Sequence, residues 1–453
     1  MADATPSGPL AGLDDIDWAN LQHAYGSAED VPGLLKALRV HDKEELDQVY
    51  FALSSNILHQ GSRYQATSYA VPFLYALLDT KDTPRREELL YYLVNVALGH
   101  PSNFVPLGVD IVTWRSIVAE TQQPNYAQDE ERKKDEYIAA ATDDQDRERR
   151  EGEFMFTLSP EKMTARKLYE LRAYDAVGAG LSSVYKCLKD GNADLRAVAA
   201  FCLGFFPEDK VRIEGQLLAL LGHEDDVAVR GTAFISLALL QAPSTGTLER
   251  TEVAQYLETC YTKEHNDEAS KWSSAIGLAI LRVYEPEVVN TILQAITDDD
   301  FLRILQHDHC KRFPFAYPDL PSLAASVLKV KGSHFPQVTR TTLAQLESSK
   351  GQTTWYLTEL VLESAFDGKP LSNTRPLGLT TPLEDVTDTN NVPPFSELTQ
   401  LQQETLRALV RVNQSNWRLV NFVRILREWG VPSTKEALDA YVDGKESETK
   451  MSS

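Results

Sequence analysis

A repeat with a step of 34 residues constrains this chain more than any other feature of its sequence. Aligning Arg196 with Arg230 also superposes Ala199 on Ala233, within a stretch that runs from residue 174 to residue 240. A unit of this length has room for two short helices, and stacked helix pairs bury a continuous apolar core between neighbours. The repeat therefore predicts an all-α fold, an α-solenoid of helix pairs that form an α-α superhelix.

The second helix of each unit indicates how neighbouring pairs pack. An acidic turn precedes the helix, where a carboxylate can accept hydrogen bonds from free backbone N–H groups. Small alanines let two helices approach closely, and apolar residues at i, i+3 and i+4 fill the core between repeats. The run Asp226-Val-Ala-Val-Arg-Gly-Thr-Ala233 resembles the second helix of HEAT repeats. This resemblance implies a HEAT-like, armadillo-like helical solenoid.

Three further stretches resemble a family of HEAT-repeat proteins found in bacteria and fungi. They are residues 16–35 (IDWANLQHAYGSAEDVPGLL), residues 59–67 (HQGSRYQAT) leading to 71–74 (VPFL), and residues 174–177 (YDAV). The resemblance spans most of the chain in outline. It implies a helical-repeat architecture and no agreed activity.

Charge and proline content divide the expected array into segments. Residues 121–165 are crowded with charges of both signs, which is typical of a solvated helix or an insert. Residues 367–396 contain five prolines, which favour a long irregular loop. We therefore expect N-terminal helical pairs over 10–120, a charged insert over 121–165, HEAT-like repeats over 166–366, a proline-rich loop over 367–396, a C-terminal helical cap over 397–443 and a disordered tail over 444–453.

The overall composition indicates an acidic globular protein. Hydrophobic residues make up 43% of the chain and charged residues 25%, which is enough apolar material for a substantial core. The 45 Lys and Arg residues face 66 Asp and Glu residues, so the net charge is −21. Because such a surface repels polyanions, we expect neither nucleic acid nor an anionic membrane as a partner.

Cysteine spacing and the N-terminal residues favour a cytoplasmic protein. Cys187, Cys202, Cys260 and Cys310 show no CxxC spacing, which is typical of reduced thiols. Residues 1–12 contain neither a basic region nor an apolar segment of the signal-peptide kind, and no apolar run approaches the length of a membrane span.

Five residues are candidates for acid–base chemistry: His59, Tyr64, Tyr174, Asp175 and His307. The run His59-Gln60-Gly61-Ser62-Arg63-Tyr64 places an imidazole and a phenol at a turn between two expected helices. The structural alternative is that the same side chains satisfy free backbone groups at helix ends, with Gly61 in a left-handed conformation. Helix ends always need such partners, so the structural role is favoured.

The run His307-Asp308-His309-Cys310 is dense in groups that can bind metals, but its spacing alone identifies no complete ligand set. The aromatic residues that follow it favour a loop instead, and we expect no metal. The chain contains no GxSxG, Walker loop, HExxH or EF-hand motif, and no cofactor is expected.

The repeat pattern favours a non-enzymatic binding or scaffold protein. Its concave groove, lined by the second helices, would hold a protein or peptide partner. The alternative is a cofactor-independent lyase, cyclase or isomerase of a small-molecule, secondary-metabolite pathway. Its pocket would lie in the solenoid and be closed by residues 367–396. A deep enclosed pocket with two or more of the five candidate side chains converging would favour the enzyme.

Overall fold

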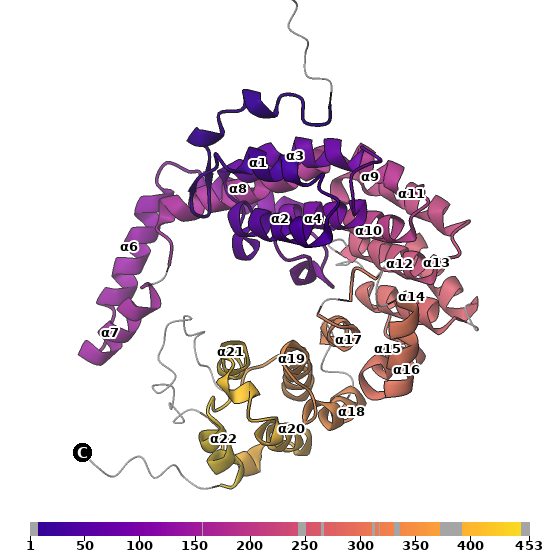
Figure 1. Ribbon diagram of the computed structural model, residues 1–453. Coiled ribbons are helices and arrows are strands. Elements are labelled where there is room, and N and C mark those ends of the chain that lie inside the picture. Colours follow the sequence, from indigo (N-terminus) through magenta and orange to yellow (C-terminus); the bar gives the residue numbers. More distant parts are fainter. Residues whose placement is uncertain are drawn as a thin grey trace, which may run out of the picture. The chain divides into compact units, whose positions relative to one another are not determined.

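The computed structural model describes residues 8–155, 157–242, 251–263, 267–309, 313–316, 318–329, 336–371 and 392–444. These residues form helix after helix (Figure 1), and the one sheet among them is a hairpin. In this hairpin β1 (Gln22–His23) pairs antiparallel with β2 (Gly26–Ser27). The predicted all-α fold is confirmed. Within the described ranges, no helix combines the length and the apolar character that crossing a membrane requires.

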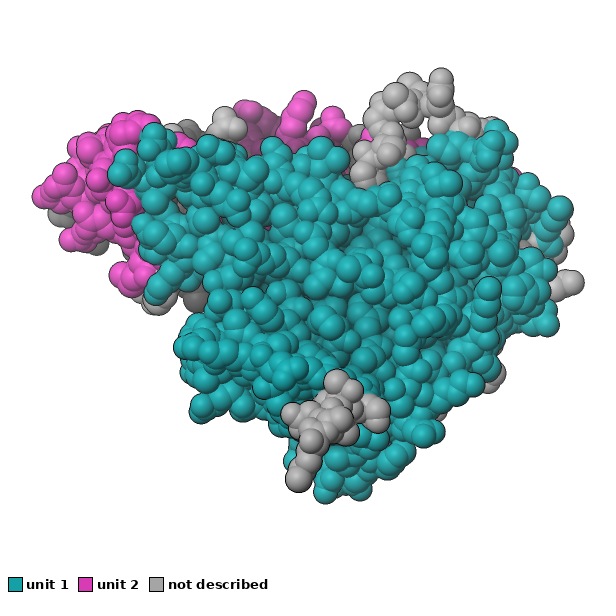
Figure 2. All heavy atoms as spheres, turned by 90° about the horizontal axis from the view of Figure 1, so that it is seen from above, with its two compact units in different colours: residues 1–130, 158–281, 308–315 teal, residues 131–157, 282–307, 316–453 magenta. Residues whose placement is uncertain are grey.

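The chain divides into two compact units, coloured teal and magenta in Figure 2. Unit 1 contains residues 1–130, 158–281 and 308–315. Unit 2 contains residues 131–157, 282–307 and 316–453. The short segment 308–315 therefore belongs to unit 1, although the residues before and after it in the sequence belong to unit 2.

Unit 1 is built from short helices that follow one another with brief turns. Its elements, besides the hairpin, are η1 (Leu13–Asp15), η2 (Trp18–Asn20), α1 (Val31–Ala37), α2 (Lys43–Asn56), η3 (His59–Gly61), α3 (Gln65–Leu78), α4 (Arg86–Leu98), η4 (Pro101–Phe104), α5 (Ile111–Thr121), α8 (Pro160–Ala179), α9 (Leu181–Cys187), α10 (Ala193–Leu203), η5 (Pro207–Asp209), α11 (Lys210–Leu221), α12 (Val227–Gln241), α13 (Glu252–Lys263) and α14 (Glu268–Ile280).

The helices α4, α10, α12 and α14 form a row in unit 1, each packed against the next. Helices α9, α11 and α13 pack against α10, α12 and α14 respectively, so helix pairs stack in a solenoid-like array (Figure 1). The repeat-equivalent residues Ala199 and Ala233 are both fully buried in this row. Their small side chains permit the close helix approach that the sequence pattern predicts.

The 34-residue step recurs in the hydrogen bonds of the turns. Arg196 Nη1 donates to the carbonyl of Asp190 at 2.9 Å, and Arg230 Nη1 donates to the carbonyl of Glu224 at 3.4 Å. Each arginine thus reaches back six residues to the turn before its own helix. The side chains of Asn192 and Asp226, also 34 residues apart, accept hydrogen bonds at the N-termini of α10 and α12.

Unit 2 contains the remaining helices of the described chain. They are α6 (Tyr126–Ala139), which begins in unit 1, α7 (Asp144–Glu153), α15 (Pro286–Thr297), α16 (Asp299–His309), which ends in unit 1, α17 (Leu320–Lys329), α18 (Pro336–Leu346), α19 (Gln352–Phe366), η9 (Phe395–Glu397), α20 (Gln400–Arg411), η10 (Asn416–Arg418), α21 (Val420–Glu428) and α22 (Lys435–Val442). Here α17 and α18 pack on α19, α18 on α20, and α20 on α22.

Two expectations about particular segments can be compared with the structure. The charged residues 121–165 include α6 and α7, where Arg150 pairs with Asp146 at 2.9 Å and lies over the Tyr137 ring at 4.6 Å. The sequence Thr399-Gln-Leu-Gln402 has the form of a capping box, and the structure has this capping box at the start of α20. Most of the proline-rich segment 367–396, and nearly all of 444–453, lie outside the described residues.

Candidate functional site

His59 and Tyr64 flank the turn between α2 and α3, and His59 contacts the hairpin residue Tyr25. The hydroxyl of Tyr25 lies 3.3 Å from His59 Nδ1, and the two rings meet edge to face at 5.4 Å. Burial raises the pKa of the Tyr64 phenol and outweighs the nearby Arg166 guanidinium, which lowers it. The phenol therefore stays protonated. The backbone N–H of Tyr64 donates to Thr67 Oγ1 at 2.8 Å.

The backbone of this turn explains why its sequence is specific. Gln60 and Gly61 both adopt left-handed conformations, with φ of 49° and 78°. A Cβ atom at Gly61 would clash with the imidazole of His100. That imidazole donates from Nε2 to the carbonyl of Gln60 at 3.2 Å, and Arg63 Nη1 donates to the carbonyl of Gly61. These contacts serve the turn itself, as the structural alternative expects.

Tyr174 and Asp175 form a second polar group, on α8. The Tyr174 hydroxyl donates 2.8 Å to Glu208 Oε2 and lies 3.0 Å from the carbonyl of Phe205. Arg115 on α5 donates to both Asp175 oxygens, at 3.1 and 2.7 Å, and to Glu208 at 3.0 Å. Burial, followed by the Glu208 carboxylate, raises the pKa of Tyr174, whose side chain is 1% exposed.

The two polar groups do not share a described contact. His59 and Tyr64 have Tyr25 as their common neighbour, whereas Tyr174 and Asp175 have Arg115 and Glu208. The fifth candidate, His307, belongs to α16, but its side chain lies outside the described part of the structure. Among the described residues, no group of three His, Cys, Asp or Glu side chains is placed to hold a metal ion.

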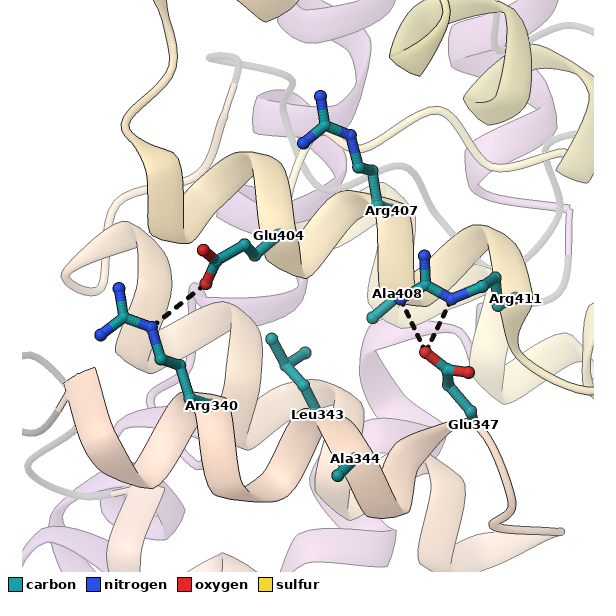
Figure 3. Close-up of a pocket in the computed structure, with 8 residues that line it drawn as sticks. All are labelled: Arg340, Leu343, Ala344, Glu347, Glu404, Arg407, Ala408 and Arg411. Carbon is teal, nitrogen blue, oxygen red and sulfur yellow. Dashed lines mark hydrogen bonds and ion pairs between the residues drawn. The ribbon is translucent and has the colours of Figure 1, made fainter.

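A groove in unit 2 has a different character, because it is open and lined by paired charges around an apolar floor. It has a volume of about 320 Å³ and lies between α18 and α20 (Figure 3). Leu343 and Ala344 on α18 and Ala408 on α20 supply the floor. Its charged lining residues are Arg340, Glu347, Glu404, Arg407 and Arg411.

Two ion pairs of opposite polarity join the helices on either side of this groove. Arg340 Nε on α18 donates to Glu404 Oε2 on α20 at 3.2 Å. Seven residues further along each helix, Arg411 on α20 donates from Nε and Nη2 to Glu347 on α18, both at 2.7 Å (Figure 3). Because residue numbers increase together along both helices, α18 and α20 run parallel.

The third arginine of the groove is held by an aromatic ring. The guanidinium of Arg407 lies over the Phe395 ring at 5.0 Å. Sequence reasoning missed this groove, since the residues that form it are 64 positions apart across the proline-rich segment. The capping box at Thr399, which starts α20, was the one local signal nearby.

No protein-family model matches the chain, and neither a curated protein nor a solved structure matches it. The structure defines an all-α protein of stacked helices with an open, arginine-lined groove in unit 2. What this protein does must therefore be argued from its own residues.

Proposed function

We propose that the protein is a non-enzymatic binding protein that holds a segment of a partner protein or peptide. The groove between α18 and α20 carries this proposal. An open groove with an apolar floor and polar walls is suited to an extended segment whose side chains alternate between floor and rim. The partner's apolar side chain would rest on Leu343 and Ala344.

The hydrogen bonds of the groove favour a partner segment that carries carboxylates. The bond of Arg340 to Glu404 uses Nε, which leaves the two terminal nitrogens of this half-exposed guanidinium to bind a carboxylate. Arg411 likewise keeps Nη1, since its bonds to Glu347 use Nε and Nη2. Seven helical residues span roughly 10 Å, which matches about three residues of an extended chain.

The net charge of −21 does not oppose such a partner at close range. At physiological ionic strength, charges further away than roughly 8 Å are largely screened, so the charges of the groove itself dominate near its surface. They are three arginines and two glutamates, so positive charge is in excess there. We expect a segment with two acidic residues two positions apart, both pointing to the rim, and an apolar residue between them that points to the floor.

We also assign the helix pairs of unit 1 to the HEAT-like class. The support is the 34-residue spacing of Arg196 and Arg230, each of which bonds the carbonyl six residues before it. This assignment fits a binding role, because helical-repeat surfaces offer extended grooves without a catalytic constellation. A cytoplasmic location remains a prediction from the sequence.

The lyase, cyclase or isomerase alternative has no comparable support. Tyr174 and Asp175 are engaged by Glu208 and Arg115, and His59 contacts Tyr25 at a turn. Since these contacts satisfy the candidate groups without a substrate, no particular reaction follows from their geometry.

A peptide array tests the proposal. The purified protein is applied to extended peptides with two Glu residues two positions apart, to the matched Gln peptides, and to random peptides. Wild type should retain the Glu peptides, and Ala344→Trp should lose them because the indole fills the exposed groove floor. Ala219→Trp, at an exposed alanine of α11 in unit 1, is the matched control and should bind as wild type does. Equal binding of the Glu and Gln peptides, or binding that survives Ala344→Trp, would refute the proposal.

A further inference from the structure

Two buried phenylalanines belong to unit 1, although the residues on either side of their segment in the sequence belong to unit 2. Phe313 and Phe315 lie in the segment 308–315, which unit 1 receives from between two parts of unit 2. Their side chains are 5% and 4% exposed. The ring of Phe315 meets Phe201 edge to face at 4.7 Å, and the ring of Phe313 meets Trp272 in the same manner at 6.5 Å.

The surface that receives these rings comes from three helices of the row. We call it the aromatic cradle, and it consists of Tyr91 on α4, Phe201 on α10, Phe205 just after the end of α10, and Trp272 on α14. Tyr91 stacks on Phe201 at 5.7 Å, and Phe201 meets Phe205 edge to face at 5.1 Å. Edge-to-face and stacked arrangements of this kind are the favoured aromatic geometries, so the cradle offers ring surfaces on which further aromatic side chains can pack.

We propose that the aromatic cradle is a docking site for a partner segment in which two aromatic side chains flank one residue. Phe313-Pro314-Phe315 is then the chain's own occupant of that site. The seated segment itself shows the chemistry that fits: two rings, one on Phe201 and one on Trp272, separated by a single residue. The proposal concerns unit 1 and does not depend on the groove of unit 2.

The chain's own segment sets how tightly a partner can bind. A segment tethered to its site has an effective concentration in the millimolar range, so it competes with any segment from solution. Binding of a partner to the wild-type protein should therefore be weak, and removal of the two tethered rings should strengthen it.

A peptide taken from the chain itself is the direct probe. Its sequence is Arg-Phe-Pro-Phe-Ala-Tyr-Pro, from residues 312–318, with a fluorescent label. Fluorescence anisotropy should show binding to the variant Phe313→Ala/Phe315→Ala at least about tenfold tighter than to wild type. The same peptide with both phenylalanines replaced by alanine should not bind. Adding Phe201→Ala to the double variant should abolish binding, because Phe201 supplies the ring beneath Phe315.

The other outcomes contradict the proposal. A double variant that keeps its helical circular dichroism but binds no peptide would show that the cradle accepts no segment in trans. If the double variant unfolds and excess peptide does not restore its fold, the two rings belong to the hydrophobic core and the cradle is not a docking site. A wild-type dimer that exchanges this segment, and is lost in the double variant, would assign the site to a second copy instead of a partner.

Discussion

Arg196 and Glu224 form a two-pronged ion pair between α10 and the turn that precedes α12. Nε donates to one carboxylate oxygen at 2.7 Å and Nη2 donates to the other at 2.9 Å. The Glu224 side chain is 5% exposed, and Oε1 also accepts from the backbone N–H of Asp226 at 3.0 Å. The pair therefore joins two successive helix pairs through a carboxylate that accepts from both a guanidinium and the backbone.

The unfolding free energy should depend on pH through the ionisation of Glu224 in this pair. Burial alone would raise the pKa of Glu224, but the bonds from Arg196 and from the backbone of Asp226 outweigh it and lower the pKa. The ionised carboxylate thus stabilises the fold above the unfolded pKa of about 4.3, and this contribution is lost as the pH falls through the lower folded value. Glu224→Gln should cost about 2 kcal/mol at pH 7 and progressively less below pH 4, measured by urea unfolding.

The neighbouring carboxylate provides the control for this experiment. Asp225 is exposed, so Asp225→Asn should leave the unfolding free energy within about 0.5 kcal/mol of wild type at every pH. A Glu224→Gln effect that does not diminish towards acid pH would contradict the assigned ionisation.

Loss of the Tyr174 hydroxyl should destabilise unit 1. Tyr174→Phe removes the donor to Glu208 and leaves the carbonyl of Phe205 without this partner, at a cost of about 1–2 kcal/mol in unfolding free energy. Tyr25→Phe is the matched control, because Tyr25 is 68% exposed and its change should be nearly neutral. Equal effects of the two substitutions would show that the Tyr174 bonds contribute nothing measurable.

Two glycine-to-alanine substitutions should have opposite effects. A Cβ atom at Gly180 would overlap the ring of Tyr75, which is fixed by a 2.8 Å hydrogen bond from its hydroxyl to the carbonyl of Val177. Gly180→Ala should therefore destabilise by about 1–3 kcal/mol. Gly215 lies within α11 with open space around its Cβ position, so Gly215→Ala should stabilise by about 0.5–1 kcal/mol. Urea midpoints of the two variants on the same side of wild type would refute this.

The three cysteines of unit 1 that the structure describes should differ in thiol reactivity. Burial raises the pKa of Cys187 to about 11 and that of Cys202 further, and both side chains are buried. Cys260 is only partly buried. At pH 8 an alkylating reagent should modify Cys260 in the folded protein and spare Cys187 and Cys202 until denaturant is added. Peptide mass spectrometry would locate each label, and rapid labelling of Cys202 without denaturant would contradict its burial.

The sequence predicted what is local and periodic. The 34-residue step between Arg196 and Arg230 reappears in equivalent turn bonds, and the capping box at Thr399 is present, because a helix cap and a repeat turn depend on neighbouring residues. It could not predict the partners that tertiary packing brings together. Arg115 and Asp175 are 60 residues apart, the paired charges of the groove are 64 residues apart, and no spacing rule joins such positions.

The aromatic residues illustrate the same limit. The sequence indicated a loop of aromatic residues after the run His307–Cys310. It did not indicate that Phe315 rests on Phe201, because that contact depends on a return of the chain to unit 1 from a distant position.

The placement of Phe313 and Phe315 also has a consequence for synthesis on the ribosome. Helix α14 is synthesised before these two residues and therefore leaves the ribosome before them, so the rings of Phe201 and Trp272 stay uncovered for a time on the order of seconds. A nascent chain halted shortly after α14 would expose this aromatic surface, and chaperones would bind there first.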